Sequence, residues 1–311
     1  MFSLFLRFSF KFVALIVFSL SLGIMTAQAA NPLVDVDWVK SNTGKDNVVF
    51  IDLRAAGSYQ AGHVPGAINT SYGRDQWRMK LNGINGMRPP VAHLKKLVEK
   101  LGIKNNSHVV LMHGGYSAAE TGIATRIYWT LKLIGLKEIS ILNGGMTAYL
   151  KDKTAKLEKG RVAPVATTFN IEMNRSILAT ANDVETGLKN DVQLLDSRPT
   201  DQHIGINKSG SVTRYGTLPN SISIPGRWMT VNDKGVFRSK SVLAKIYAAQ
   251  KASSKRNTIV FCNTGHWASL GWFIDSELLG NKQSKMYDGS LAQWSRLPAV
   301  DHPLMVKLNT Q

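Results

Sequence analysis

The sequence predicts an α/β protein with two tandem domains, each a mostly parallel sheet flanked by helices. Three observations favour this fold class. Short apolar runs rich in β-branched residues alternate with helical patterns, four sequence segments recur in the second half, and 311 residues suffice for two domains of ordinary size. Hydrophobic residues make up 44% of the chain, which is enough to fill two cores.

The first 29 residues are predicted to be a signal peptide. Arg7 and Lys11 carry positive charge, and the apolar stretch 12–24 that follows is short for a membrane span. The sequence AQAA then fits cleavage after Ala29. We therefore expect a periplasmic or secreted protein with no stable membrane insertion after signal removal. An uncleaved anchor is the alternative, because ten uncharged residues follow the apolar stretch.

An internal repeat divides the rest of the chain into two halves. The four recurring segments keep their order and are offset by 144 to 154 residues. Because chance similarity rarely preserves order four times, we infer a tandem duplication. The pairs are VVFIDLR (48–54) with VQLLDSR (192–198), GHVPGAINTSY (62–72) with GTLPNSISIPG (216–226), VVLMHGG (109–115) with TIVFCNT (258–264), and ILNGGMTAY (141–149) with KMYDGSLAQW (285–294).

The two expected domains span 30–150 and 169–311, and a polar, lysine-rich linker at 151–168 joins them. Each domain contains continuous apolar runs that are typical of strands covered on both faces. The predicted strands are VVFID (48–52), HVVLM (108–112), VQLLD (192–196) and TIVF (258–261), and the clearest predicted helices are 89–102 and its counterpart 239–250.

The composition excludes several function classes. The formal net charge is +17, but the basic residues are mixed with acids and form no aromatic-interleaved runs, so we expect no nucleic-acid partner. The single cysteine, Cys262, excludes an internal disulfide framework and a multi-cysteine metal site. We expect neither a metal nor another cofactor.

Cys262 lies between a predicted strand and a predicted helix at 267–280. Ligands of α/β sheets bind beyond the carboxyl ends of strands, where helix N-termini offer free N–H groups. A helix N-terminus contributes at most ~2 kcal/mol to a thiolate, so amides of the loop have to supply the rest. We expect a reactive thiolate that lies open in a cup of amides. The alternative is a buried, inert cysteine.

The predicted active-site loop comprises six residues. Gly265 lets the chain curl closely around an anion, because glycine adopts positive φ without strain. The loop is Asn263, Thr264, Gly265, His266, Trp267 and Ala268. An arginine at the last position would favour phosphate chemistry, and Ala268 argues against a phosphatase.

These motifs resemble the rhodanese family, specifically its tandem-domain sulfurtransferases, over nearly all of the mature chain. The resemblance implies that the second domain alone is catalytic and that Cys262 carries sulfur as a persulfide. It implies transfer from a small anionic donor, of the thiosulfate or 3-mercaptopyruvate type, to a thiol, to cyanide or to a protein acceptor. His113 takes the cysteine position in the first domain, and we interpret it as structural.

Several residues admit two roles each. Arg198 and Arg227 are candidate contacts for the donor's anionic group, although Arg198 also fits a structural pair with Asp196. His266 either supplies a proton or positive charge near neutrality, or it points to solvent or caps the helix. Trp267 either walls the site or packs in the core. Thr264 matches neither the residue that thiosulfate-preferring members of the family carry at this position nor the residue that mercaptopyruvate-preferring members carry there. A periplasmic sulfur carrier or redox-partner module without turnover is therefore the alternative function.

Overall fold

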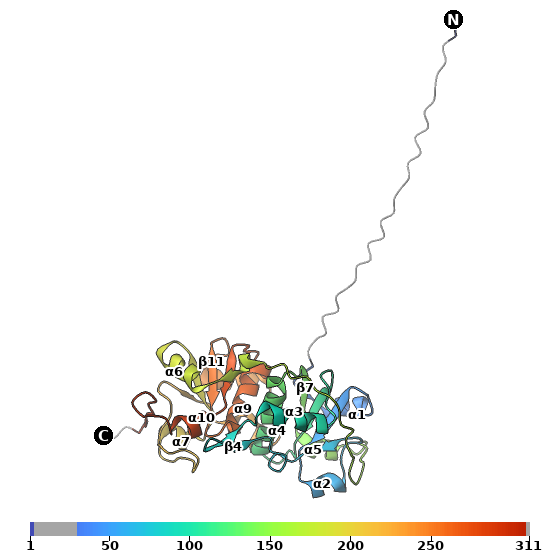
Figure 1. The fold of residues 1–311 in the computed structure, drawn as a ribbon, viewed down its shortest axis with the longest axis horizontal. Coiled ribbons are helices and arrows are strands. Elements are labelled where there is room, and N and C mark those ends of the chain that lie inside the picture. Colours follow the sequence, from blue (N-terminus) through green and yellow to red (C-terminus); the bar gives the residue numbers. More distant parts are fainter. Residues whose placement is uncertain (3–29, 309–311) are drawn as a thin grey trace.

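The computed structural model describes residues 1–2 and 30–308. The predicted signal peptide falls almost entirely outside these residues. In the part described, no helix is both long and apolar enough to span a membrane. Figure 1 shows the two halves side by side, with the first half in blue and green and the second in yellow to red.

The first half is built on a sheet of five parallel strands, as the apolar runs predict. Its strand order is β1 (Leu33–Val34), β7 (Glu138–Leu142), β6 (His108–Met112), β2 (Val48–Asp52) and β3 (Ile68–Asn69). The helices are α1 (Val36–Asn42), α2 (Ala56–Ala61), α3 (Val91–Lys100), α4 (Ala118–Leu133) and α5 (Gly145–Lys151).

The second half repeats this sheet. Read from the opposite edge, its order is β8 (Leu178–Ala179), β12 (Ser284–Tyr287), β11 (Thr258–Phe261), β9 (Gln193–Asp196) and β10 (Ile222–Ser223), again all parallel. The recurring segments therefore occupy equivalent strands, and the inferred duplication explains the topology. Both β9 and β11 are buried along their whole length, as expected for strands covered on both faces.

Helices again connect the strands of this second sheet. The α-helices are α6 (Ala181–Lys189), α7 (Thr200–Ile204), α8 (Lys240–Ala249), α9 (His266–Trp272) and α10 (Ser290–Trp294). Short 3₁₀ helices are η1 (Arg175–Ile177), η2 (Gly226–Met229) and η3 (Val231–Asp233), and α9 continues directly into the π-helix η4 (Phe273–Leu278). The helices predicted at 89–102 and 239–250 are thus α3 and α8.

The lysine-rich segment 151–168 packs against the first domain. His63 and Glu158 form a β-bridge, and the N–H of Val162 donates to the hydroxyl of Tyr59 at 3.1 Å. Farther along, Thr167 donates its N–H to the carbonyl of Glu99 at 3.0 Å. The polar composition suggested a solvated connector, but these bonds bind the segment to the domain it leaves.

Helices α4 and α9 lie side by side in the middle of the molecule, between the two sheets (Figure 1). Helix α4 is buried along nearly its whole length, and Lys132 near its end pairs with Glu277 of η4 at 2.7 Å. An antiparallel hairpin of β4 (Met79–Leu81) and β5 (Ile84–Met87) also reaches from the first half toward α10. The interface therefore brings elements of the first domain next to the start of α9.

Candidate active site

Cys262 directly follows β11, and the turn after it leads into α9. Its side chain borders the main hydrophobic core, and the residue is only 1% exposed. It also lines a cavity of about 450 Å³ at the domain interface. The packing of β11 and α9 buries Cys262, so its expected opening can only be toward this cavity.

Both domains line this cavity. The first domain contributes Tyr72, Arg78, Ala119, Glu120 and Ile123, and the second contributes Ser209, Ser211, Cys262, Asn263, Thr264, His266 and Trp267. The charged residues among them are Arg78 and Glu120. Glu120 accepts a hydrogen bond from the N–H of Tyr116 at 2.8 Å, so its carboxylate is held on the first-domain side.

The backbone amides of the loop are free. Among the residues that the structure describes, none accepts a hydrogen bond from the N–H of any residue from Asn263 to Ala268. The first N–H groups of a helix have no partner within the helix, and here the unpaired donors extend back through the turn to Asn263. Such a set of donors suits an anion bound within the loop.

The start of α10 secures the first part of the loop. The N–H groups of Leu291 and Ala292 donate to the carbonyls of Cys262 and Asn263 at 3.1 and 2.8 Å. The N–H of Cys262 donates to the hydroxyl of Ser290 at 3.1 Å, and this hydroxyl lies 4.0 Å from the cysteine Sγ. Ser290 belongs to the YDGS motif, but sequence reasoning gave it no role.

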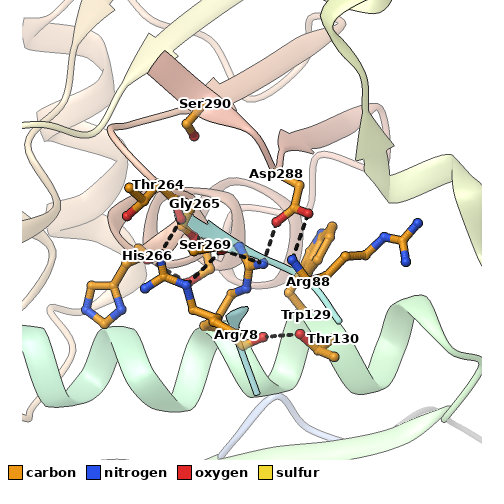
Figure 2. Close-up of polar contacts among 12 residues, drawn as sticks. Arg78, Arg88, Trp129, Thr130, Thr264, Gly265, His266, Ser269, Asp288 and Ser290 are labelled. Atoms are coloured by element: carbon orange, nitrogen blue, oxygen red, sulfur yellow. Dashed lines mark hydrogen bonds and ion pairs between the residues drawn. The ribbon is translucent and has the colours of Figure 1, made fainter. Parts of the chain in front are cut away.

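Two arginines of the first domain bind the second part of the loop (Figure 2). Arg78, just before β4, donates from Nη2 to the carbonyl of Thr264 at 2.5 Å. Arg126, in the middle of α4, donates from Nη1 to the carbonyl of Gly265 at 3.1 Å and forms a buried ion pair with Asp288. The first domain therefore contacts the candidate active-site loop directly.

The remaining loop residues occupy the positions that the sequence predicts. Gly265 has φ of +75°, and a Cβ there would come 2.3 Å from Nη1 of Arg126, so only glycine fits. Ala268 is fully buried and supplies no guanidinium. Trp267 combines its two predicted roles, because it lines the cavity and also packs against the core.

His266 bridges the domains instead of pointing to solvent. Its Nδ1 lies 3.2 Å from the hydroxyl of Tyr72, and its Nε2 lies 3.1 Å from the carbonyl of Ala119. The Nε2 atom is therefore the protonated one, because a carbonyl can only accept. Burial, reinforced by the nearby cations Arg78 and Arg126, lowers the pKa of His266 to about 3. A positive charge near neutrality, one of the roles open to His266, does not fit these surroundings.

Arg198 lies outside the cavity. Its guanidinium is fully buried and bonds both carboxylate oxygens of Asp196 and the carbonyl of Gly216. Arg54 makes the same set of contacts with Asp52 and the carbonyl of Gly62 in the first domain. The candidate substrate role of Arg198 is therefore not supported by its position, and the structural alternative fits.

Arg227 is not among the residues that line the cavity either. Its side chain is 64% exposed and pairs with Asp233 at 3.2 Å. Nearer the loop, Gln202 accepts a hydrogen bond from the side chain of Asn263 at 2.8 Å. A neutral amide thus supports the start of the loop.

Sequence reasoning missed the contribution of the first domain to the site. Tyr72, Arg78 and Glu120 have no local pattern that marks them, because the fold alone brings them to the loop. Arg126 did carry a signal, since it is a lone charge within the apolar helix GIATRIYWTL. Within residues 30–308, no three metal-ligating side chains come together.

Comparisons with known proteins agree with the duplicated fold. Residues 35–152 and 180–297 each match the Rhodanese-like domain. A Saccharopolyspora erythraea protein named "Putative thiosulfate sulfurtransferase" is 30% identical, with 86% of this chain and 94% of that protein covered.

Two solved structures share the fold at lower identity. SseA of Escherichia coli, a 3-mercaptopyruvate sulfurtransferase, matches with a TM-score of 0.72 and 23% identity over 84% of this chain and 99% of its own. EanB, solved with a cysteine persulfide and ergothioneine, matches with a TM-score of 0.75 and 20% identity over 89% of this chain and 71% of its own. The chain therefore belongs to the tandem-domain rhodanese family of sulfurtransferases.

Proposed function

We propose that the protein transfers a sulfane sulfur through a persulfide on Cys262. The Cys262 thiolate attacks the outer sulfur of a donor of the thiosulfate or 3-mercaptopyruvate type. A new S–S bond forms on Cys262, the bond from that sulfur to the rest of the donor breaks, and its electron pair leaves with sulfite or with the enolate of pyruvate. A thiolate or cyanide acceptor then attacks the terminal sulfur and releases the Cys262 thiolate.

One observation carries this proposal: Cys262 borders a cavity at the start of a loop whose six amides, from Asn263 to Ala268, have no hydrogen-bond acceptor among the described residues. An anionic persulfide supplies the missing acceptor. Donors fixed in advance around a developing negative charge stabilise it without reorganisation, and one such donor contributes roughly 3–4 kcal/mol in other enzymes.

A thiocyanate assay with cyanide and either thiosulfate or 3-mercaptopyruvate tests the proposed turnover. We expect thiocyanate release by the wild-type protein and none by Cys262→Ser, because a hydroxyl cannot form a persulfide under these conditions. Release that persists in the serine variant would refute the assignment of Cys262.

The charge of the cavity favours a second candidate, a sulfur carrier for a partner protein. Arg78 is the one cation among the lining residues, and its guanidinium already donates to the carbonyls of Gly86 and Thr264 and to the hydroxyl of Tyr72. A small anionic donor thus meets no unoccupied guanidinium there. The carrier function predicts that Cys262 gains a sulfur without rapid release of thiocyanate.

We also propose that the protein is exported and works in the periplasm or outside the cell. The basic start, short apolar stretch and AQAA sequence of residues 1–30 support this proposal. N-terminal sequencing of the protein from its native host tests it. A chain that starts at Ala30 supports cleavage after Ala29, whereas a membrane-bound chain that starts at Met1 supports the uncleaved anchor.

A further inference from the structure

The four carbonyls at the start of the active-site loop are anchored in two pairs. The carbonyls of Cys262 and Asn263 accept hydrogen bonds from α10, within the second domain. The carbonyl of Thr264 accepts from Arg78, and that of Gly265 accepts from Arg126 and also, at 3.3 Å, from the N–H of Ser269 in α9. Arg78 and Arg126 therefore add anchors from the first domain to the second half of the loop.

Peptide geometry links these carbonyls to the free amides. In a planar trans peptide, the C=O of one residue and the N–H of the next point in opposite directions. A carbonyl of Thr264 drawn toward Arg78 turns the N–H of Gly265 away from Arg78. In the same way, the bond from Arg126 to Gly265 sets the direction of the N–H of His266.

The fold holds both guanidinium groups in place. Arg78 also donates from Nε to the carbonyl of Gly86 at 2.9 Å, and its guanidinium carbon lies 5.8 Å from the centre of the Tyr72 ring. Gly86 has φ of +80°, and a Cβ there would come 1.8 Å from Nη2 of Arg78. Only glycine at this position of β5 lets Arg78 reach the loop.

Arg126 is held more deeply. It is fully buried, it pairs with Asp288 of the second domain, and its guanidinium carbon lies 5.0 Å from the centre of the Trp129 ring. A buried cation is costly unless several partners satisfy it, so a purely apolar contact between α4 and α9 would be simpler to build. Its placement against the loop carbonyl indicates a role in the site.

We propose that Arg78 and Arg126 are positioning residues through which the first domain sets the amides of the catalytic loop toward the sulfur on Cys262. The inference rests on the proposed persulfide function. The first domain has no cysteine, yet it completes the site by fixing two peptide groups and by placing two positive charges beside an anion.

The principal test compares Arg78→Ala with Arg88→Ala. Arg88 ends the same hairpin, but Figure 2 shows its side chain pointing away from the loop, and its guanidinium bonds only the adjacent carbonyl of Pro89 among the described residues. We expect kcat for sulfur transfer to fall about tenfold in Arg78→Ala, less than the 10²–10³ typical of a lost direct donor, with KM nearly unchanged. Arg88→Ala is expected to match the wild type.

A second readout follows Cys262 without any sulfur donor. The rate of iodoacetamide alkylation against pH reports the fraction of thiolate, and we expect its midpoint to rise by about one pH unit in Arg78→Ala. Arg78→Lys keeps the charge but loses the planar fork. It should restore the alkylation midpoint while kcat stays low, because the lysine does not fix the Thr264 peptide in the same way.

Arg126 needs a compensated variant. Arg126→Ala alone leaves Asp288 buried without its cation, so Asp288→Asn is added to prevent a general loss of stability. Lys132→Ala removes an ion pair between the domains that does not touch the loop, and it serves as the interface control. We expect a lower kcat in the Arg126 double variant and wild-type kcat in the Lys132 variant, with melting temperatures measured for all.

The outcomes separate the two proposals. Equal kcat values and alkylation midpoints in Arg78→Ala, Arg88→Ala and the wild type would overturn the inference and leave the persulfide function standing. A wild-type protein that neither turns over nor gains sulfur on Cys262 would refute the persulfide function. The alkylation midpoint of Arg78→Ala would still decide whether Arg78 acts on the thiolate.

Discussion

Arg198 and Arg227 both carry a guanidinium near β9 or β10, but their surroundings differ sharply. Arg198 is buried in contact with Asp196, whereas Arg227 is largely exposed beside Asp233. Breaking a buried pair leaves an unpaired charge in the interior, and an exposed pair contributes little. At the scale of single residues, burial therefore separates structure from substrate contact.

We predict that Arg198→Ala lowers the free energy of unfolding by about 3–5 kcal/mol, because Asp196 is left buried without its cation. Arg227→Ala is the matched control and should cost less than about 1 kcal/mol. Urea titration measures both. A stable Arg198→Ala variant with a raised KM for the donor would contradict the structural role and restore the substrate role.

His266 makes stability depend on pH in a defined direction. Its pKa is lowered to about 3 in the folded protein, so the unfolded chain, with the ordinary value near 6.5, binds the proton more readily between these values. Protonation therefore favours unfolding as the pH falls from 6.5 toward 3. We predict that the advantage in melting temperature of the wild type over His266→Gln shrinks between pH 7 and pH 4.5. A constant difference would contradict the low pKa.

The sequence singles out Cys262 and its loop as a candidate site, but it does not predict the residues that surround them. Cys262 and Gly265 can be identified from the local sequence, because their residue types and their position between a strand and a helix are enough to mark them. Arg78 contacts Thr264, which lies 186 positions away in the sequence, and His266 contacts Tyr72, which lies 194 positions away. No local pattern encodes such contacts. The burial of Cys262 likewise depends on how β11 and α9 pack in the folded protein.

At the scale of elements, the helix that follows the loop buries an acidic side chain, which costs folding free energy. The predicted helix 267–280 forms α9 and then widens into the π-helix η4, which holds the fully buried Asp275. Its Oδ2 accepts from Asn281 at 2.9 Å, and its Oδ1 has no partner among the described residues. Periodicity alone predicts a helix here but does not distinguish α from π.

Burial raises the pKa of Asp275 to about 7, so folding is weakened as the pH rises from about 4, the ordinary value for the free carboxyl, to 7. We predict that Asp275→Asn, which mimics the protonated form, raises the melting temperature at pH 8 and has little effect at pH 4.5. Differential scanning calorimetry at the two pH values measures this. A variant that is less stable at pH 8 would show that the carboxylate is stabilised in the folded protein.

At the scale of the whole molecule, the duplication explains why each loop depends on the opposite domain. In the first domain, Met146 donates its N–H to the carbonyl of His113 at 2.7 Å, as Leu291 does to Cys262. Two residues further on, the carbonyl of Gly115 accepts from the N–H of Gly235 in the second domain at 3.1 Å. Thr264 occupies the equivalent position and accepts from Arg78. The two halves therefore brace each other's loops at matching carbonyls.

The repeat and its strand order follow from the sequence, because four segments keep both their order and their apolar pattern. The position of α4 against α9 does not follow from the sequence, because each of the two sequences indicates only a buried apolar helix. The two helices contact each other in the folded protein, and residues of both line the cavity.

Substitution of His113 tests whether the first domain has a chemical role of its own. The residue is buried, both ring nitrogens lack partners in the part of the chain described, and burial lowers its pKa to about 4. We predict that His113→Leu leaves kcat unchanged and raises the free energy of unfolding by about 1–3 kcal/mol, because two unpaired polar atoms are removed. A folded variant with lost sulfur transfer would reveal a catalytic histidine.

A mass spectrum of the native protein after incubation with thiosulfate or 3-mercaptopyruvate is the most direct measurement of the account. We predict a gain of one sulfur atom on the peptide that contains Cys262, reversed by cyanide and absent in Cys262→Ser. A native Cys262 that gains no sulfur and reacts with iodoacetamide only after unfolding would contradict the account, because it would show the thiol sealed from the cavity and inert.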